Sequence, residues 1–213
     1  MTRRISLITI SILCLAAFVT LLVRIEMQEY DKIPAKADAV IVLAGRFDED
    51  LQRLAEGVRL VEQGFGGCLI LPLRDRGLSW KTLQRIYGIH TTIPVDKVLI
   101  GRPEHIDPAV LKYCGGTFSE AAVTVRLMRA NTLSSAVVVS SRYHIPRVRL
   151  AFQKINSNGS LTFSYLPVGE PETGKLLSSA YALAKRLIEY GKFFTALFMY
   201  PIGAEIMEYH RPE

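Results

Sequence analysis

No feature of this 213-residue sequence limits its fold more than the segment 136–152, AVVVSSRYHIPRVRLAF. It opens with four apolar residues, of which three are β-branched, and this composition favours a strand buried on both faces. Two serines follow, and Pro146 then stands where a proline suits the first turn of a helix. A buried strand that leads directly into a helix predicts an α/β domain.

Further apolar runs alternate with segments of helical spacing along the chain. We expect strands at 37–45, 68–73, 98–100, 136–139 and 161–168, and helices at 48–64, 79–87, 117–130, 145–155 and 175–199. This alternation predicts parallel pairing through right-handed crossovers. The expected fold is a three-layer α/β sandwich with a mostly parallel sheet of about five strands, in one domain that spans 37–200.

Several helix boundaries are predicted from local motifs. Thr117 and Glu120 have the Thr-x-x-Glu spacing of a capping box, which predicts that a helix begins at Thr117. The segment 101–116 contains two prolines and two adjacent glycines and is expected to be mostly loop. Asp48 is expected to cap the helix after the first strand. The last helix is expected to cover the sheet, with contact to a membrane as the alternative, and residues 201–213 are expected to form a tail after it.

Residues 5–23 contain no charged side chain over nineteen positions. A helix of that length spans roughly 28 Å, which is close to the thickness of a bilayer's hydrocarbon core. We therefore expect a cytoplasmic stub and one transmembrane helix within 1–24 and a polar tether at 25–36, with a cleaved signal peptide as the main alternative. Two arginines precede the run and acidic residues predominate after it, which places the domain outside the cytoplasm.

The formal charge of +6 favours anionic partners such as phosphates or anionic lipid, whereas no motif supports nucleic-acid binding. The motifs GxGxxG, Walker A, HExxH and GxSxG are absent, which removes support for dinucleotide, NTPase, zinc-protease and ordinary hydrolase functions. The four histidines do not cluster, and Cys14, Cys68 and Cys114 lack metal-ligand spacing, so no metal site is predicted. No cofactor is assigned, since an adenosyl cofactor would rest on fold analogy alone.

If the first strand and the 136–139 strand are neighbours, the loops 45–48 and 140–147 form one cleft at the edge where α/β sheets bind ligands. His144 is the candidate for proton transfer, because its unperturbed pKa near 6.5 lies close to working pH, and Glu120 could orient it or pair with an arginine. The candidates for holding an anion are Gly45, Arg46, Arg53, Thr117, Ser140, Ser141, Arg142 and Arg147. The alternative is that the arginines are solvated and that His144 is only a cap.

Four features together carry a resemblance: an apolar N-terminal segment, DAVIVLAG at 38–45 followed by Arg53, the Thr117–Glu120 spacing and, above all, YHIPR at 143–147. In these motifs the chain resembles the YdcF/SanA/ElyC family over roughly 37–168, and the helical segment IEYGK at 188–192 is also similar to that family. The resemblance implies a Rossmann-like domain in the bacterial envelope, anchored in the inner membrane and linked to barrier function and peptidoglycan assembly. It does not imply a particular reaction.

The chain departs from the family pattern at three places. LPLR at 71–74 replaces a Ser-Gly-Gly-like turn, Trp80-Lys81 stands near an expected glutamate, and Ser140 replaces a threonine. Residues and resemblance together predict a membrane-anchored envelope protein that binds, with or without processing, a phosphorylated or otherwise anionic metabolite or lipid-linked precursor. The alternative function is a non-catalytic scaffold or ligand sensor.

Overall fold

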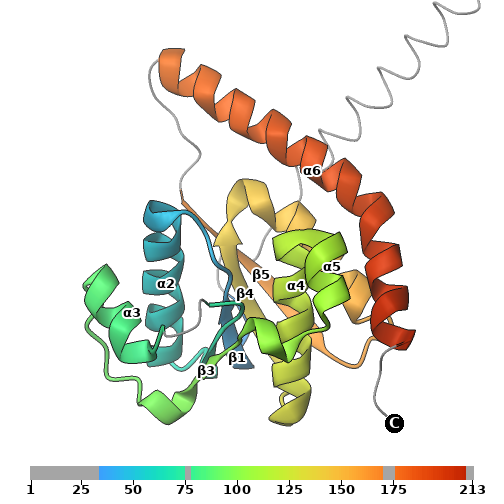
Figure 1. Ribbon diagram of the computed structural model, residues 1–213. Coiled ribbons are helices and arrows are strands. Elements are labelled where there is room, and N and C mark those ends of the chain that lie inside the picture. The colour runs from blue at the N-terminus through green and yellow to red at the C-terminus, as the bar shows by residue number, and fades with distance from the viewer. Residues whose placement is uncertain (1–33, 75–77, 170–175, 210–213) are drawn as a thin grey trace, which may run out of the picture. The chain divides into compact units, whose positions relative to one another are not determined.

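The computed structural model describes residues 34–74, 78–169 and 176–209, so the predicted anchor and most of the tether lie outside the described residues. One sheet of five parallel strands lies at the centre of the domain, in the order β3-β2-β1-β4-β5 (Figure 1). The strands are β1 (Ala37–Val42), β2 (Gly66–Leu71), β3 (Val98–Ile100), β4 (Ser135–Ser141) and β5 (Thr162–Val168). The α/β class and the parallel sheet are therefore confirmed, and the architecture is consistent with a Rossmann-like fold.

Strand β1 separates the two halves of the sheet. It pairs with β2 on one side, with Ile41 opposite Ile70, and with β4 on the other, with Val42 opposite Val139. Strands β2 and β3 are therefore added on one side of β1, and β4 and β5 on the other. The C-terminal ends of β1 and β4 lie side by side. In parallel sheets this switch point leaves a crevice between loops that diverge to opposite faces.

Helices cover both faces of the sheet (Figure 1). Helices α2 (Phe47–Glu62) and α3 (Trp80–Tyr87) lie on one face, where their apolar side chains join those of Val40 and Val42 in one core. Helices α4 (Pro108–Ala130) and α5 (Ile145–Ile155) lie on the other face, and α6 (Leu176–Tyr209) packs against both of them. Because both faces are covered, the side chains of 39–43 are completely buried.

Several local predictions are confirmed. The hydroxyl of Ser79 accepts the backbone N–H of Thr82 at the start of α3, and Gly88 ends that helix with a φ of 62°. Pro146 lies in the first turn of α5, where its missing N–H has no helical partner to lose. The short strand β3 lies at 98–100 as expected.

The predicted start of a helix at Thr117 is wrong. Helix α4 begins at Pro108, and the carboxylate of Asp107 caps it by accepting the Ala109 N–H at 2.7 Å. Glycine in a helix costs about 1 kcal/mol, but the burial of Val110 and Phe118 on either side of the two glycines stabilises one continuous helix. Thr117 therefore lies well inside α4, where its hydroxyl is available for other contacts.

Two further boundaries differ from the expectations. Helix α2 begins at Phe47, so Asp48 lies in its first turn, where its charge suits the helix dipole, and does not cap it. Helix α6 continues through Pro201 to Tyr209, so much of the predicted tail is helical. The buried ring of Tyr200, 4.9 Å from that of Phe118, holds α6 against α4 beside the proline.

Within the three ranges that the structure describes, no helix is both long and apolar enough to cross a bilayer. The predicted span at 5–23 lies outside those ranges.

Gly57 allows α2 to lie close to β1. A Cβ at this position would lie 2.2 Å from Cγ2 of Val42, a fully buried side chain with little rotamer freedom. We expect Gly57→Ala to lower the free energy of unfolding by about 1–3 kcal/mol in urea denaturation of the full-length protein. Adding Val42→Ala should recover part of this loss, and strictly additive losses would contradict the contact.

Candidate functional site

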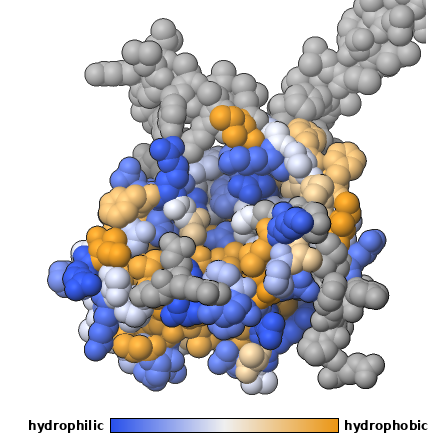
Figure 2. Space-filling view, viewed as in Figure 1, coloured by the Kyte–Doolittle hydropathy of each residue, from blue (hydrophilic) through white to orange (hydrophobic). Residues whose placement is uncertain are grey.

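The C-terminal ends of β1 and β4 open onto a pocket of about 480 Å³, a size typical of small-molecule sites. Its lining comes from residues within 44–53 after β1, within 143–147 after β4, and within 188–192 of α6. Figure 2 shows hydrophilic residues in a hollow in the upper part of the view. The structure thus brings together the two loops that the sequence predicted to share a cleft.

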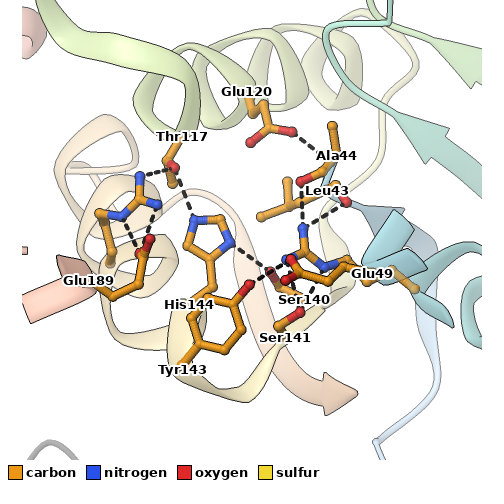
Figure 3. A network of polar contacts seen from close by, with 12 residues as sticks. Leu43, Ala44, Glu49, Thr117, Glu120, Ser140, Ser141, Tyr143, His144 and Glu189 are labelled. Atoms are coloured by element: carbon orange, nitrogen blue, oxygen red, sulfur yellow. Dashed lines mark hydrogen bonds and ion pairs between the residues drawn. The ribbon is translucent and has the colours of Figure 1, made fainter. Parts of the chain in front are cut away.

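His144 lies in the pocket wall with both ring nitrogens hydrogen-bonded (Figure 3). Its Nδ1 is 3.0 Å from Oγ of Ser140, and its Nε2 is 3.1 Å from Oγ1 of Thr117. Burial lowers the pKa of His144 well below its usual value, and the positive charges of Arg147 and Arg53 add to this effect. The imidazole is therefore neutral at pH 7, with one nitrogen donating and the other accepting.

Arg53 is almost completely buried, and protein atoms occupy all five of its N–H groups. Its Nη1 donates to the carbonyl oxygens of Leu43 and Ala44. Its Nε and Nη2 donate to Oγ of Ser141 at 3.2 and 2.9 Å, and Nη2 also pairs with Glu49 at 3.2 Å. Arg53 contributes positive charge to the pocket, but its hydrogen bonds fix the end of β1 in place.

Arg147 keeps donors available. Its Nε and Nη2 donate to Oε2 of Glu189 at 3.2 and 3.0 Å, and its Nη1 donates to the hydroxyl of Thr117. These bonds use three of the five N–H groups, and no other residue in the described part of the chain occupies the remaining two. The second oxygen of Glu189 accepts from Lys192 at 2.6 Å, so α6 supplies both an acidic and a basic group to this wall.

Glu120 does not make the predicted contact with His144. Its Oε1 accepts the backbone N–H of Ala44 at 2.7 Å, which ties α4 to the loop after β1 (Figure 3). Burial raises the pKa of Glu120 to about 7, although the Ala44 N–H and the charges of Arg74, Arg53 and Arg147 act in the opposite direction. Glu120 therefore does not line the pocket but holds the backbone of Ala44, which does.

The other predicted site residues are divided between the pocket and its surroundings. Gly45 and Arg46 line the pocket, and a Cβ at Gly45 would lie 3.0 Å from Nη1 of Arg53, so the glycine admits the arginine. Ser140 and Ser141 are buried at the end of β4, beneath the pocket surface. Arg142 is exposed and is not part of the lining.

Six residues of the lining were not predicted from the sequence. They are Ala44, Glu49, Tyr143, Ile188, Glu189 and Lys192. The hydroxyl of Tyr143 donates to Glu49 at 2.5 Å, so the segment after β4 is joined directly to the first turn of α2. Tyr143 belongs to the YHIPR motif, which could have indicated it. The segment IEYGK at 188–192, which also resembles the family, could have indicated Glu189, but it does not identify the partner Arg147, which lies 42 positions away.

A second buried ion pair lies behind the loop, toward β2. Arg74 donates to Oδ2 of Asp50 at 2.7 Å, and the hydroxyl of Tyr87 donates to the same oxygen at 2.6 Å. Burial and the Asp50 carboxylate raise the pKa of Tyr87 to about 12. Arg74 belongs to the LPLR segment, and its positive charge has the largest effect of the three arginine charges that lower the pKa of Glu120.

No group of three or more His, Cys, Asp or Glu residues placed to hold a metal ion occurs among the residues that the structure describes. Comparisons of the chain with protein-family models, with curated proteins and with solved structures found no match. The geometry of the pocket is therefore the basis for assigning a function.

Proposed function

We propose that this protein binds a phosphorylated or otherwise anionic small molecule in the pocket at the ends of β1 and β4. The excess of positive charge in the lining carries the proposal. Four cationic side chains face two carboxylates there, so their formal charges sum to +2. A neutral His144 leaves that excess unchanged, and burial strengthens its attraction for an anion.

Arg147 is the residue best placed to contact the ligand. Glu189 and Thr117 hold its guanidinium in position, and its two remaining N–H groups match the oxygens of a phosphate or carboxylate. Arg46 and Lys192 add charge at the exposed rim of the pocket. The guanidinium of Arg147 can donate two parallel hydrogen bonds, and the flexible side chains of Arg46 and Lys192 add positive charge beside it. This combination suits a multiply charged oxyanion such as a phosphate.

In this proposal the protein binds its ligand at the outer face of a bacterial inner membrane. The binding would serve peptidoglycan assembly or the maintenance of the envelope barrier. Two sequence features support that part: the uncharged run at 5–23 and the resemblance of the YHIPR segment to envelope proteins.

Binding without turnover is the form of the proposal that the geometry favours. Ser140 and Thr117 contact His144, but both hydroxyls are buried, and Ser140 is completely inaccessible. A nucleophile must reach its substrate, and these two do not. The second candidate is hydrolysis with His144 as a base for water, which its position in the pocket wall favours.

Pyrophosphate titrated into the full-length protein in detergent, followed by calorimetry, tests the proposal. We expect Arg147→Gln to weaken binding about 10- to 100-fold, because charge-assisted hydrogen bonds contribute about 1.5–3 kcal/mol. Arg147→Lys should give an intermediate affinity, and Arg142→Gln, an exposed arginine outside the lining, should bind like the wild type. Thermal melts of each variant separate loss of binding from loss of folding.

The outcome that overturns the proposal is equally direct: no binding of pyrophosphate or inorganic phosphate by the folded wild type, or the same affinity in Arg147→Gln. Release of phosphate is measured in the same samples. Release that disappears in His144→Gln would establish hydrolysis in place of binding alone, whereas we expect none above the buffer control.

A further inference from the structure

Helix α6 carries an exposed apolar stripe, which we define as Ile188, Gly191, Thr195, Phe198 and Ile202. At about 100° per residue these positions fall within roughly a quarter of the helix circumference. Ile188, Phe198 and Ile202 are 59%, 75% and 48% exposed, which is far above the exposure of core residues. Figure 2 shows apolar residues along the part of α6 on the right of the view.

Within 195–202 the stripe lies away from the buried side of α6, whereas Ile188 at its N-terminal end also lines the pocket. Ala196, Tyr200 and Gly203 are the buried positions of the same stretch, and their centre lies roughly 130° around the helix from that of the stripe. The exposed side chains of the stripe therefore do not contribute to the hydrophobic core of the domain. An exposed apolar surface of this kind marks an interaction site.

Polar groups within the stripe are already satisfied. The hydroxyl of Thr195 donates to the carbonyl oxygen of Gly191 at 3.0 Å, so it needs no water. Between 190 and 204 the sequence contains only one charged residue, Lys192, and no acidic one. A satisfied apolar face with a cation at its edge suits the boundary between lipid headgroups and acyl chains.

The length of chain before the domain argues for lipid as the partner. The uncharged run ends at residue 23 and β1 begins at Ala37, so the tether of twelve residues at 25–36 spans at most about 40 Å. If the run is a membrane span, the tether keeps the start of the domain within about 40 Å of the bilayer surface. The bilayer is then the apolar phase that is always within reach of the stripe.

From these observations we propose that the apolar stripe of α6 lies in the interfacial region of the bilayer. Ile188 and Lys192 belong to both α6 and the pocket lining, so the pocket begins where the stripe ends. The pocket then opens at the level of the headgroups. This part rests on the proposed function and narrows its ligand class to an amphiphile, with an anionic phosphate head in the pocket and its apolar chain in the membrane.

Tryptophan quenching in proteoliposomes tests the docking of the stripe. The chain has one tryptophan, Trp80, which is 2% exposed, so added indoles report on their own positions. We expect brominated lipid to reduce the added emission of Phe198→Trp and Ile202→Trp about twofold or more. The matched control is Ile86→Trp, an exposed apolar position on α3 at the other face of the sheet, whose added emission should not change.

Absence of quenching at both α6 positions overturns the inference. In that case, a blue-shifted emission that depends on protein concentration would identify a second copy of the chain as the partner, and one independent of concentration would identify another segment of this chain. Pyrophosphate binding is measured on the same preparations. Binding without quenching would leave the proposed function standing and the docking refuted, whereas quenching without binding would do the reverse.

Discussion

Arg53→Leu is expected to lower the free energy of unfolding by about 3–5 kcal/mol, because it removes one partner of a buried charged network. The change would leave the carbonyl oxygens of Leu43 and Ala44 and the hydroxyl of Ser141 without their donor. It would also remove the ion pair of Glu49, whose carboxylate keeps the hydrogen bond from the hydroxyl of Tyr143. Each buried polar group that loses its partner adds a desolvation cost.

Urea denaturation of the full-length protein in detergent, followed by circular dichroism, measures this loss. Arg59→Leu is the matched control, because Arg59 lies on the same helix but is exposed and bonds only to Glu56 and Gln63 at the surface. We expect the control to change the free energy by less than about 1 kcal/mol. Arg53→Lys keeps the charge with fewer donors and should be intermediate. Equal losses in the two leucine variants would contradict the role assigned to Arg53.

Glu120 is expected to make the protein less stable as the pH rises from 4.5 to about 7. Burial raises its pKa from 4.5 to about 7, so within this range the folded state binds a proton that the unfolded state has released. The contribution of Glu120 to the free energy of unfolding is therefore greatest below pH 4.5. It declines as the pH rises, until the carboxylate is charged in both the folded and the unfolded state. The full difference is on the order of 3 kcal/mol.

The comparison of Glu120→Gln with the wild type isolates this effect. Glutamine can still accept the Ala44 N–H but cannot ionise, so the variant should gain stability relative to the wild type by about 3 kcal/mol between pH 5 and pH 8. Asp96→Asn, which changes an exposed carboxylate, should leave the pH dependence as it is. If Glu120→Gln retains the wild-type pH dependence, the buried charge is not its source.

His144 contributes with the opposite sign. Its folded-state pKa is lowered below 6.5, so on acidification the unfolded state gains a proton that the folded state does not accept. The stability from His144 is present above pH 6.5 and is lost below it. The measured wild-type curve therefore combines two opposed effects, and only the difference between variant and wild type assigns each part.

Where the predictions of helix boundaries failed, a local pattern was outweighed by packing. Thr117 and Glu120 have the spacing of a capping box, but Asp107 and Pro108 provide an earlier start, and the burial of Phe118 favours one continuous helix. The same continuity changes what the two residues do. Thr117 contacts His144 and Arg147, and Glu120 holds the loop after β1.

The identity of the pocket's third wall could not be predicted, because α6 contacts residues far away in the sequence. The pairing of Arg147 with Glu189 spans 42 positions, and no periodicity or motif encodes which face of α6 meets α5. The sequence does show an apolar C-terminal helix. It does not show that its turn at 188–192 completes the pocket.

By itself, the sequence determined the strands, the parallel sheet and the meeting of two loops at one edge, because β-branched runs and connection lengths act locally along the chain. The tertiary structure alone decided which cations remain open to a ligand. The sequence shows that both side chains are positively charged. Only the structure shows that all five N–H groups of Arg53 have protein acceptors, whereas two of those of Arg147 remain available to a ligand. That difference arises because folding brings carbonyl and carboxylate oxygens from distant segments to one guanidinium and leaves donors of the other facing the pocket.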